Sequence, residues 1–435
     1  MKNVQTSARC GQIAAPPLWD KVRGIGAPLA VFPKPRYVNV MTQDFNSIVS
    51  TIALIAVLAI APVAPEAGNT LFLIAGALGL FLMWPDAMAQ VRRPIVWMPL
   101  AGLVLVAAAY GISAGADGLV GLLYFAPLLA IWPLVTLLQS SERPQLALIS
   151  GVLALCGASG AAIMAMFEVQ STGTTRAGEL VANPIHFADV ALLVGSTALI
   201  GALVVKSPWR FMFGLAPVLA VIAVLLSGTR GAVVAVVAML VIAFVTAALL
   251  RLFSRRLLLV SGVCLLVAVA GFWMLGGAQI SGVQRVLADI AATLSSGAPT
   301  DSSTALRLQM YLGGFRAFLE APIVGHGPLA FTAVADSLAD TSFGGAPHLH
   351  NDLVDMAASG GTFGVGAYVL FLLAPIAEII WSPEKPSKRA NVVLIATLVA
   401  GFFTMGLTNA MFGILTVTVT FAAICVITGL LTAPE

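Results

Sequence analysis

The sequence has very little charge. Charged residues make up 9% of its 435 residues, hydrophobic residues make up 59%, and the mean hydropathy is +1.00. A soluble globular chain carries about 25% charged residues, so the soluble classes are excluded and no nucleic-acid partner is expected. Long apolar runs also argue against a transmembrane β-barrel, whose strands are short and alternating. The composition predicts an all-α, polytopic bundle of membrane helices.

Cysteine and histidine are scarce. The four cysteines have no paired spacing, which argues against a disulfide framework and against a metal site. The sequence has no Walker A loop, no G-x-S-x-G and no Asp-x-Asp pair, and no cofactor is expected. Three of the four histidines (His326, His348 and His350) fall in one polar stretch, 303–364. We therefore look for the chemistry in this stretch.

Apolar runs divide most of the chain into about twelve membrane helices of about 20 residues each. The runs lie at about 48–65, 70–84, 95–112, 118–138, 146–167, 185–205, 209–227, 231–250, 257–277, 357–381, 391–408 and 411–431. Residues 1–46 lack a signal-peptide core, which favours a cytoplasmic tail. We then expect helices one to nine in 47–277, a large outer loop with amphipathic helices in 278–350, and helices ten to twelve in 351–435.

The basic residues support this topology. Cytoplasmic loops of membrane proteins are enriched in lysine and arginine. If the tail is cytoplasmic, five basic residues remain outside and all are arginines: Arg176, Arg230, Arg285, Arg307 and Arg316. Arginine makes bidentate contacts to phosphate oxygens and keeps its charge. A set of outer arginines without lysine is better suited to pyrophosphate binding than to general solvation.

Two amphipathic helices are predicted in the large outer loop. The segment 281–294 has an apolar face suited to the membrane surface. A second helix, 302–320, begins at possible N-cap residues and ends before Pro322. Its apolar stripe consists of Leu308, Leu312, Phe315 and Leu319. Arg307, Tyr311 and Gly314 lie on a neighbouring face, where glycine allows close approach of a ligand or helix.

Three of the outer arginines are candidate ligands for a phosphate group. Arg230 stands at the outer mouth of two long apolar spans, where a charge is costly and is usually paired or functional. Arg176 and Arg307 lie in the two longer outer loops. The alternatives are an interfacial anchor for Arg230 and ordinary solvated loop residues for the other two.

His350 is the candidate base. It precedes Asn351 at the point where the large loop re-enters the membrane. A histidine whose pKa is near 6.5 can accept a proton from a sugar hydroxyl at neutral pH. His348 and His350 could instead be metal ligands, but zinc sites generally need three or four ligands, so no metal is predicted. His186 and His326 are interpreted as structural or substrate-lining.

These motifs resemble those of the bacterial O-antigen ligases. The carrying residues are His350-Asn351 followed by Gly361-x-x-Gly364, Arg176-Ala-Gly and Asn183-Pro184, Ser227-Gly-Thr-Arg230-Gly, Arg307 before Glu320-Ala-Pro, and Gly325-His-Gly-Pro. They cover about 170–370 and keep the family's order, although Ile185 stands where many relatives have asparagine. The resemblance extends to a superfamily that includes O-antigen and exopolysaccharide polymerases.

The resemblance implies a GT-C-like inner-membrane glycosyltransferase that is inverting and metal-independent and faces the periplasm. Its donor would be a glycan on undecaprenyl pyrophosphate, and its acceptor lipid A core or a growing glycan. Arg230 and Arg307 would hold the pyrophosphate, and His350 would activate the acceptor hydroxyl. The further substrate-binding residues that we expect are Arg176, Asn183, Tyr311, His326, His348 and Asn351.

Two other classes stay open besides ligase and polymerase. A flippase or secondary transporter would have arginines along a path, but transporters usually have duplicated halves and charges near mid-membrane. Here the charges lie on one side and no internal repeat is present. A structural membrane subunit of a polysaccharide complex is the third possibility.

Overall fold

The computed structural model describes residues 36–83, 87–138, 143–252 and 302–432, together with isolated residues between 253 and 301. All regular secondary structure in these residues is helical, so the predicted all-α polytopic bundle is confirmed. The chain divides into two units, Met1–Thr42 and Gln43–Glu435. The described part of the first unit, 36–42, is the start of helix α1. Everything below concerns the second unit.

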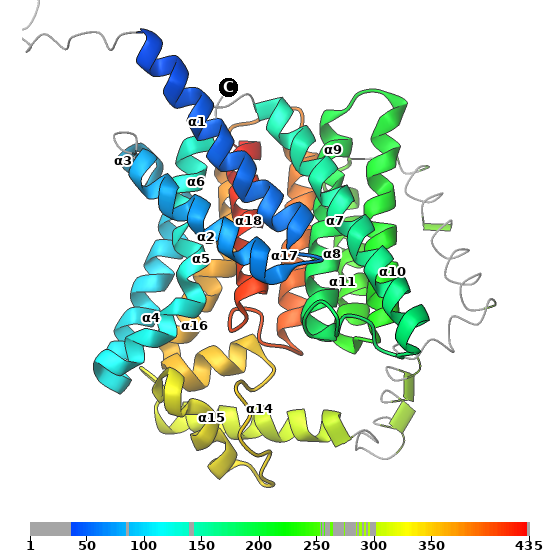
Figure 1. Ribbon diagram of the computed structural model, residues 1–435. Helices are drawn as coiled ribbons and strands as arrows, with labels where there is room; N and C mark the ends of the chain where they lie inside the picture. The colour runs from blue at the N-terminus through cyan, green and yellow to red at the C-terminus, as the bar shows by residue number, and fades with distance from the viewer. Residues whose placement is uncertain are drawn as a thin grey trace, which may run out of the picture. The chain divides into compact units, whose positions relative to one another are not determined.

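The helices follow the apolar runs of the sequence closely (Figure 1). They are α1 (Arg36–Ile55), η2 (Ala56–Ile60), α2 (Pro65–Leu82), α3 (Ala87–Gln90), α4 (Pro94–Gly118), η3 (Leu119–Phe125), α5 (Ala126–Leu129), α6 (Ile131–Leu137), α7 (Arg143–Thr172), α8 (Pro184–Thr197), α9 (Leu199–Val204), η5 (Pro208–Gly214), α10 (Leu215–Ser227), α11 (Arg230–Leu249), α14 (Ser302–Glu320), α15 (Gly327–Leu338), α16 (Asp352–Trp381), α17 (Lys388–Gly406) and α18 (Leu415–Thr432). Proline at the first position starts α2, α4 and α8, where its missing N–H costs no hydrogen bond.

Nine helical stretches within the described residues are long and apolar enough to span a membrane. One of them, Pro94–Leu137, has 44 residues, about twice the length that a bilayer core requires. Its helix is interrupted at Gly115, which has a φ of 64°, and α4 then packs against α6. The chain therefore turns back, and this stretch corresponds to two of the predicted runs.

The shorter apolar helix Phe45–Ile60 corresponds to the first predicted run. The predicted run 257–277, the surface helix 281–294 and Arg285 lie outside the described residues, apart from isolated positions.

Helix α18 forms the middle of the bundle (Figure 1) and is the most buried of the candidate spans, with 83% of its apolar window buried. Its hydroxyl groups donate to carbonyl oxygens one turn back, so they need no water inside the membrane. Phe421 of α18 packs its ring in a cluster with Phe371, Phe402 and Phe412, in which neighbouring centroids are 4.6 to 5.3 Å apart.

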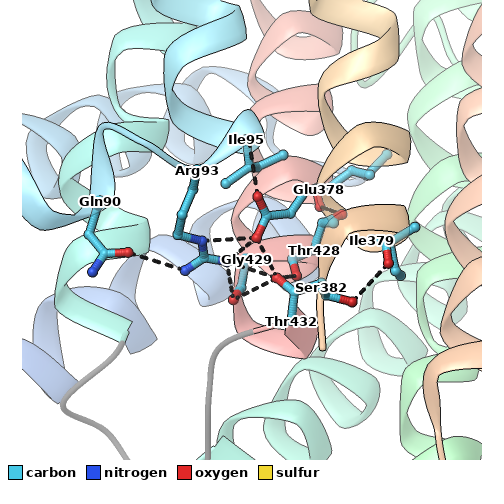
Figure 2. Close-up of polar contacts among 10 residues, drawn as sticks. Gln90, Arg93, Ile95, Glu378, Ile379, Ser382, Thr428, Gly429 and Thr432 are labelled. Carbon is cyan, nitrogen blue, oxygen red and sulfur yellow. Dashed lines mark hydrogen bonds and ion pairs between the residues drawn. The ribbon is translucent and has the colours of Figure 1, made fainter. Parts of the chain in front are cut away.

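A buried ion pair ties α4, α16 and α18 together at the predicted cytoplasmic end (Figure 2). Arg93 Nε donates to Glu378 Oε1 at 2.9 Å, and its Nη2 donates to Thr432 Oγ1 at 2.8 Å and to Gly429 O at 3.0 Å. Glu378 also accepts from Thr432 Oγ1 and Ile95 N. The carboxylate is therefore neutralised and fully hydrogen-bonded, as a buried charge must be.

Outside the membrane helices, α14 and α15 lie across the opposite end of the bundle, against α16 and α4 (Figure 1). The predicted stripe of α14 does not face the protein, because Leu308, Phe315 and Leu319 are all more than half exposed. The buried positions of α14 are Met310, Gly313, Gly314 and Ala317. Gly313 packs against the backbone of Ala335 on α15, and Gly314 against Leu349 and Val354. The expected close approach at Gly314 is thus observed.

The ion pair between Arg93 and Glu378 yields a stability prediction. In Glu378→Ala, Arg93 is left buried without its carboxylate, so we expect the free energy of unfolding to fall by about 3–5 kcal/mol. Thermal unfolding of the purified protein in detergent measures the change. Glu384→Ala is the matched control, because Glu384 is 87% exposed and its pair with Lys388 contributes little. Equal losses in the two variants would contradict the assignment.

Candidate functional site

A cavity of about 260 Å³ opens where α8, α11, α14 and the loop before α16 meet. Its lining residues include Arg176, Arg230, Arg307 and His350, which come from four separate parts of the sequence. The other lining residues are Ile185, Asp189, Gly228, Thr229, Gly231, Ser303, Leu306, Met310 and Thr408. We call it the arginine cavity. Four of the site residues that the sequence predicted therefore line one cavity.

The turn between α10 and α11 places Arg230 in this cavity. Gly228 adopts a φ of 64°, a left-handed conformation that glycine adopts without strain. Thr229 Oγ1 then donates to Pro184 O at 3.1 Å, which ties the turn to the start of α8. Arg230 is the first residue of α11, and its Nη1 donates to Thr304 Oγ1 at 3.2 Å. A helix N-terminus favours anions, so the backbone and the guanidinium attract the same kind of group.

Arg307 on α14 and Asp189 on α8 line the same cavity, and the positive charge of Arg307 acts on the Asp189 carboxyl group. Asp189 is 1% exposed, and its Oδ2 accepts a hydrogen bond from Asn409 Nδ2 at 3.0 Å. Sequence reasoning missed both Asp189 and Asn409. The signal was present for Asp189, because a carboxylate inside an apolar run is costly and usually has a partner or a function.

His350 has a strained backbone, with a φ of 56° that residues other than glycine rarely adopt. Three contacts hold it there. Tyr311 on α14 donates its hydroxyl to His350 O at 3.1 Å and also contacts Leu407 O at 3.0 Å. On the preceding side, Leu349 N donates to Asp355 Oδ1 at 2.7 Å. Strain of this kind persists where surrounding structure enforces it, often at functional sites.

Asn351, the residue after His350, provides the third contact. Its Oδ1 accepts from the backbone N–H groups of Leu353 and Val354, so it caps α16. Its Nδ2 donates to Leu407 O at 3.1 Å, at the end of α17. The residue does not line the arginine cavity. Tyr311 and Asn351 instead fix the loop that carries His350.

His348 and His350 form a pair of edge-to-face rings whose centroids are 4.2 Å apart. Burial lowers the pKa of His350 to about 4, and proximity to the His348 ring and to the positive charge of Arg307 adds to the shift, although contact with Asn409 opposes it. Burial also lowers the pKa of His348 to about 4, with smaller contributions from His186 and Arg307. Both rings are therefore neutral at pH 7 and keep a ring lone pair that can accept a proton, and the lowered pKa makes each a weaker base than an ordinary histidine.

Gly361 of the Gly361-x-x-Gly364 motif allows close packing. Gly361 interrupts α16 with a φ of 59°, and a side chain there would collide with the backbone of Ile323. Thr362 N donates to Pro322 O at 2.8 Å across the same contact. His326 lies in this region, where its Nε2 is 2.9 Å from Ala317 O. It does not line the arginine cavity.

The outer loop before α8 carries Arg176 and Asn183. Glu168, which is 2% exposed, accepts backbone N–H groups of Gly178, Glu179 and Leu180 and so closes the loop. Asn183 Oδ1 accepts from Ile185 N at 2.9 Å and caps α8. Arg176 lines the cavity and Asn183 does not.

In the part of the chain that the structure describes, no group of three or more His, Cys, Asp or Glu side chains lies close enough together to hold a metal ion.

Residues 215–369 match the family model described as O-antigen ligase. The resemblance to the O-antigen ligase superfamily is confirmed. The matched segment begins with α10, ends within α16 and contains Arg230, Arg307 and His350. It indicates an O-antigen ligase or polymerase type of function in a multi-pass membrane protein. No curated protein is similar enough to the chain to match it.

The neutral histidines yield a prediction that needs no substrate. With four histidines in the chain, ring signals in NMR spectra can be assigned from His348→Gln and His350→Gln. We expect both rings to titrate near pH 4 and to stay neutral at higher pH, because their folded-state pKa values are lowered. Arg307→Gln should raise both pKa values, whereas Arg316→Gln on the same helix should not. Midpoints near the ordinary 6.5 would contradict the geometry.

Proposed function

We propose that the protein is a periplasmic-face glycosyltransferase that moves a glycan from undecaprenyl pyrophosphate to an acceptor hydroxyl. O-antigen ligation to lipid A core is the first candidate, and polymerisation onto a growing glycan is the alternative. The observation that carries the proposal is the arginine cavity, where three guanidinium groups and a neutral histidine meet at a helix N-terminus.

The donor pyrophosphate would bind between Arg230 and Arg307. Both side chains offer planar pairs of donors that match phosphate oxygens, and the first N–H groups of α11 add to the attraction. Arg176 completes the cationic wall. These charges are fixed before substrate arrives, so they can stabilise the negative charge that develops on the leaving pyrophosphate.

His350 would be the base. The acceptor hydroxyl oxygen uses a lone pair to form a bond to the anomeric carbon, and the bond from that carbon to the pyrophosphate oxygen breaks with its electrons left on that oxygen. The hydroxyl proton passes to the His350 ring, which later releases it to water. Undecaprenyl pyrophosphate is the leaving group. Fixed arginines supply the positive charge for which many phosphate-handling sites use a divalent cation, so we propose that transfer needs no metal.

A single displacement inverts the anomeric carbon. Asp189 introduces an alternative, because a carboxylate in the cavity wall could act as a nucleophile in a double displacement that retains configuration. The hydrogen bond from Asn409 and the nearby charge of Arg307 occupy this carboxylate, and we favour inversion. NMR of the product linkage distinguishes the two: an inverted linkage supports His350 as base, and a retained one would assign Asp189 as nucleophile.

The proposed reaction is tested by glycan transfer with purified protein in detergent. Undecaprenyl-pyrophosphate-linked oligosaccharide is offered together with lipid A core, with and without EDTA. We expect EDTA-resistant product on the core. Lengthened lipid-linked chains would make the protein a polymerase and keep the chemistry. A transporter or a structural subunit would give neither glycosylated lipid A core nor lengthened lipid-linked chains, and this result would contradict the proposal.

Arg307 provides a sharper test of pyrophosphate binding. In Arg307→Lys the charge remains but the bidentate fork is lost, so we expect kcat/KM for the donor to fall by about tenfold to a hundredfold. Arg316→Lys is the control, because Arg316 lies on the same helix and pairs with Asp340 outside the cavity. Wild-type turnover in Arg307→Lys would remove Arg307 from the phosphate site.

A further inference from the structure

A second cavity, of about 200 Å³, opens on the same side of the membrane helices as the arginine cavity. It is lined by the start of α2, the first turns of α8 and the segment before and at the start of α18. Its polar side chains are those of Glu66, Asn69, His186 and Thr416, and its remaining lining residues are apolar.

The first two turns of α8 form the wall between the two cavities. Ile185 and Asp189 line the arginine cavity, whereas His186, Phe187 and Val190 line the second one. Residues four apart share one face of a helix, so Ile185 and Asp189 lie on one face of α8, and His186 and Val190 lie on the neighbouring face. The start of α8 therefore contributes to both cavities.

The two cavities differ in the charge of their lining residues. Three arginines line the first, whereas the lining residues of the second include no lysine or arginine and contain one carboxylate, Glu66. Asn69 is 4% exposed and donates through Nδ2 to Thr416 Oγ1 at 2.8 Å, but its buried Oδ1 has no hydrogen-bond partner. A buried amide oxygen without a partner is costly. A hydroxyl group entering the cavity would satisfy it.

Histidines connect the two spaces. His186 faces the second cavity and lies close enough to His348 for their ring charges to interact. His348 in turn packs its ring on that of His350, with centroids 4.2 Å apart, and His350 lines the arginine cavity. His186, His348 and His350 thus link the two cavities through neighbouring side chains.

We propose that the second cavity binds the acceptor as a neutral, hydroxyl-bearing saccharide end, with Asn69 and Glu66 accepting hydrogen bonds from its hydroxyls. This inference rests on the proposed glycan transfer. The reacting hydroxyl of this saccharide reaches past the start of α8 to the anomeric carbon, gives its proton to His350 and displaces the pyrophosphate held by Arg230 and Arg307.

The test separates the KM for the acceptor from the KM for the donor. Donor is undecaprenyl-pyrophosphate-linked oligosaccharide, and acceptor is whichever of lipid A core and lipid-linked glycan the wild-type protein extends. Glu66→Gln weakens a hydrogen-bond acceptor at the rim, and Ile414→Trp fills the cavity. Matched controls are Glu179→Gln and Leu180→Trp, at exposed positions that line neither cavity.

We expect Glu66→Gln to raise the acceptor KM about threefold to tenfold, the equivalent of one hydrogen bond, and Ile414→Trp to raise it at least as much. Neither should change the donor KM, and the controls should match wild type. An unchanged acceptor KM in both variants, or a raised donor KM, would overturn the inference while leaving the proposed function intact. If wild-type protein transfers glycan to neither acceptor, both fall.

Discussion

The strained backbone of His350 depends on one small set of hydrogen bonds, and much of the outer side of the protein is arranged to make them. The Tyr311 hydroxyl contacts both His350 O and Leu407 O, and Asn351 reaches Leu407 O from the other side. Helices α14, α16 and α17 therefore meet at a single carbonyl group. A conformation that costs about 1–3 kcal/mol is kept because three elements enforce it.

Helix α16, which follows His350, is anchored at both ends. Asp352, the first residue of α16, accepts the N–H groups of Met411 and Phe412 at 2.7 and 3.0 Å, which fixes the connection between α17 and α18. At the far end of α16, Glu378 is held by Arg93 and Thr432. The helix that follows His350 is thus tied at its start to the connection before α18 and at its far end to α18 itself.

The sequence carried the information for the fold and for the charged half of the site. Hydrophobic runs defined the spans because the bilayer enforces helix wherever it meets them. Arg176, Arg230, Arg307 and His350 stood out because charge and histidine are rare in this chain, and the structure gathers them around one cavity. Their proposed roles in glycan transfer remain predictions.

The features that could not be predicted from the sequence depend on contacts between segments far apart in the chain. Asp189 and Asn409 are 220 positions apart, and neither has a motif that pairs it with the other. The stripe of α14 was assigned by periodicity alone, which cannot tell a protein-facing side from a side exposed beside the membrane. Glu168 resembles an ordinary loop residue until its carboxylate is seen binding three backbone N–H groups. The second cavity could not be predicted, because it forms only where α2, α8 and α18 lie together in the fold.

A structure determined with undecaprenyl pyrophosphate bound would test the central claim most directly. The account predicts the pyrophosphate in the arginine cavity, within hydrogen-bonding distance of Arg230 and Arg307 and beside the N-terminus of α11, with the His350 ring facing the position of the anomeric carbon. A pyrophosphate bound in the second cavity, or one that touches neither arginine, would contradict it.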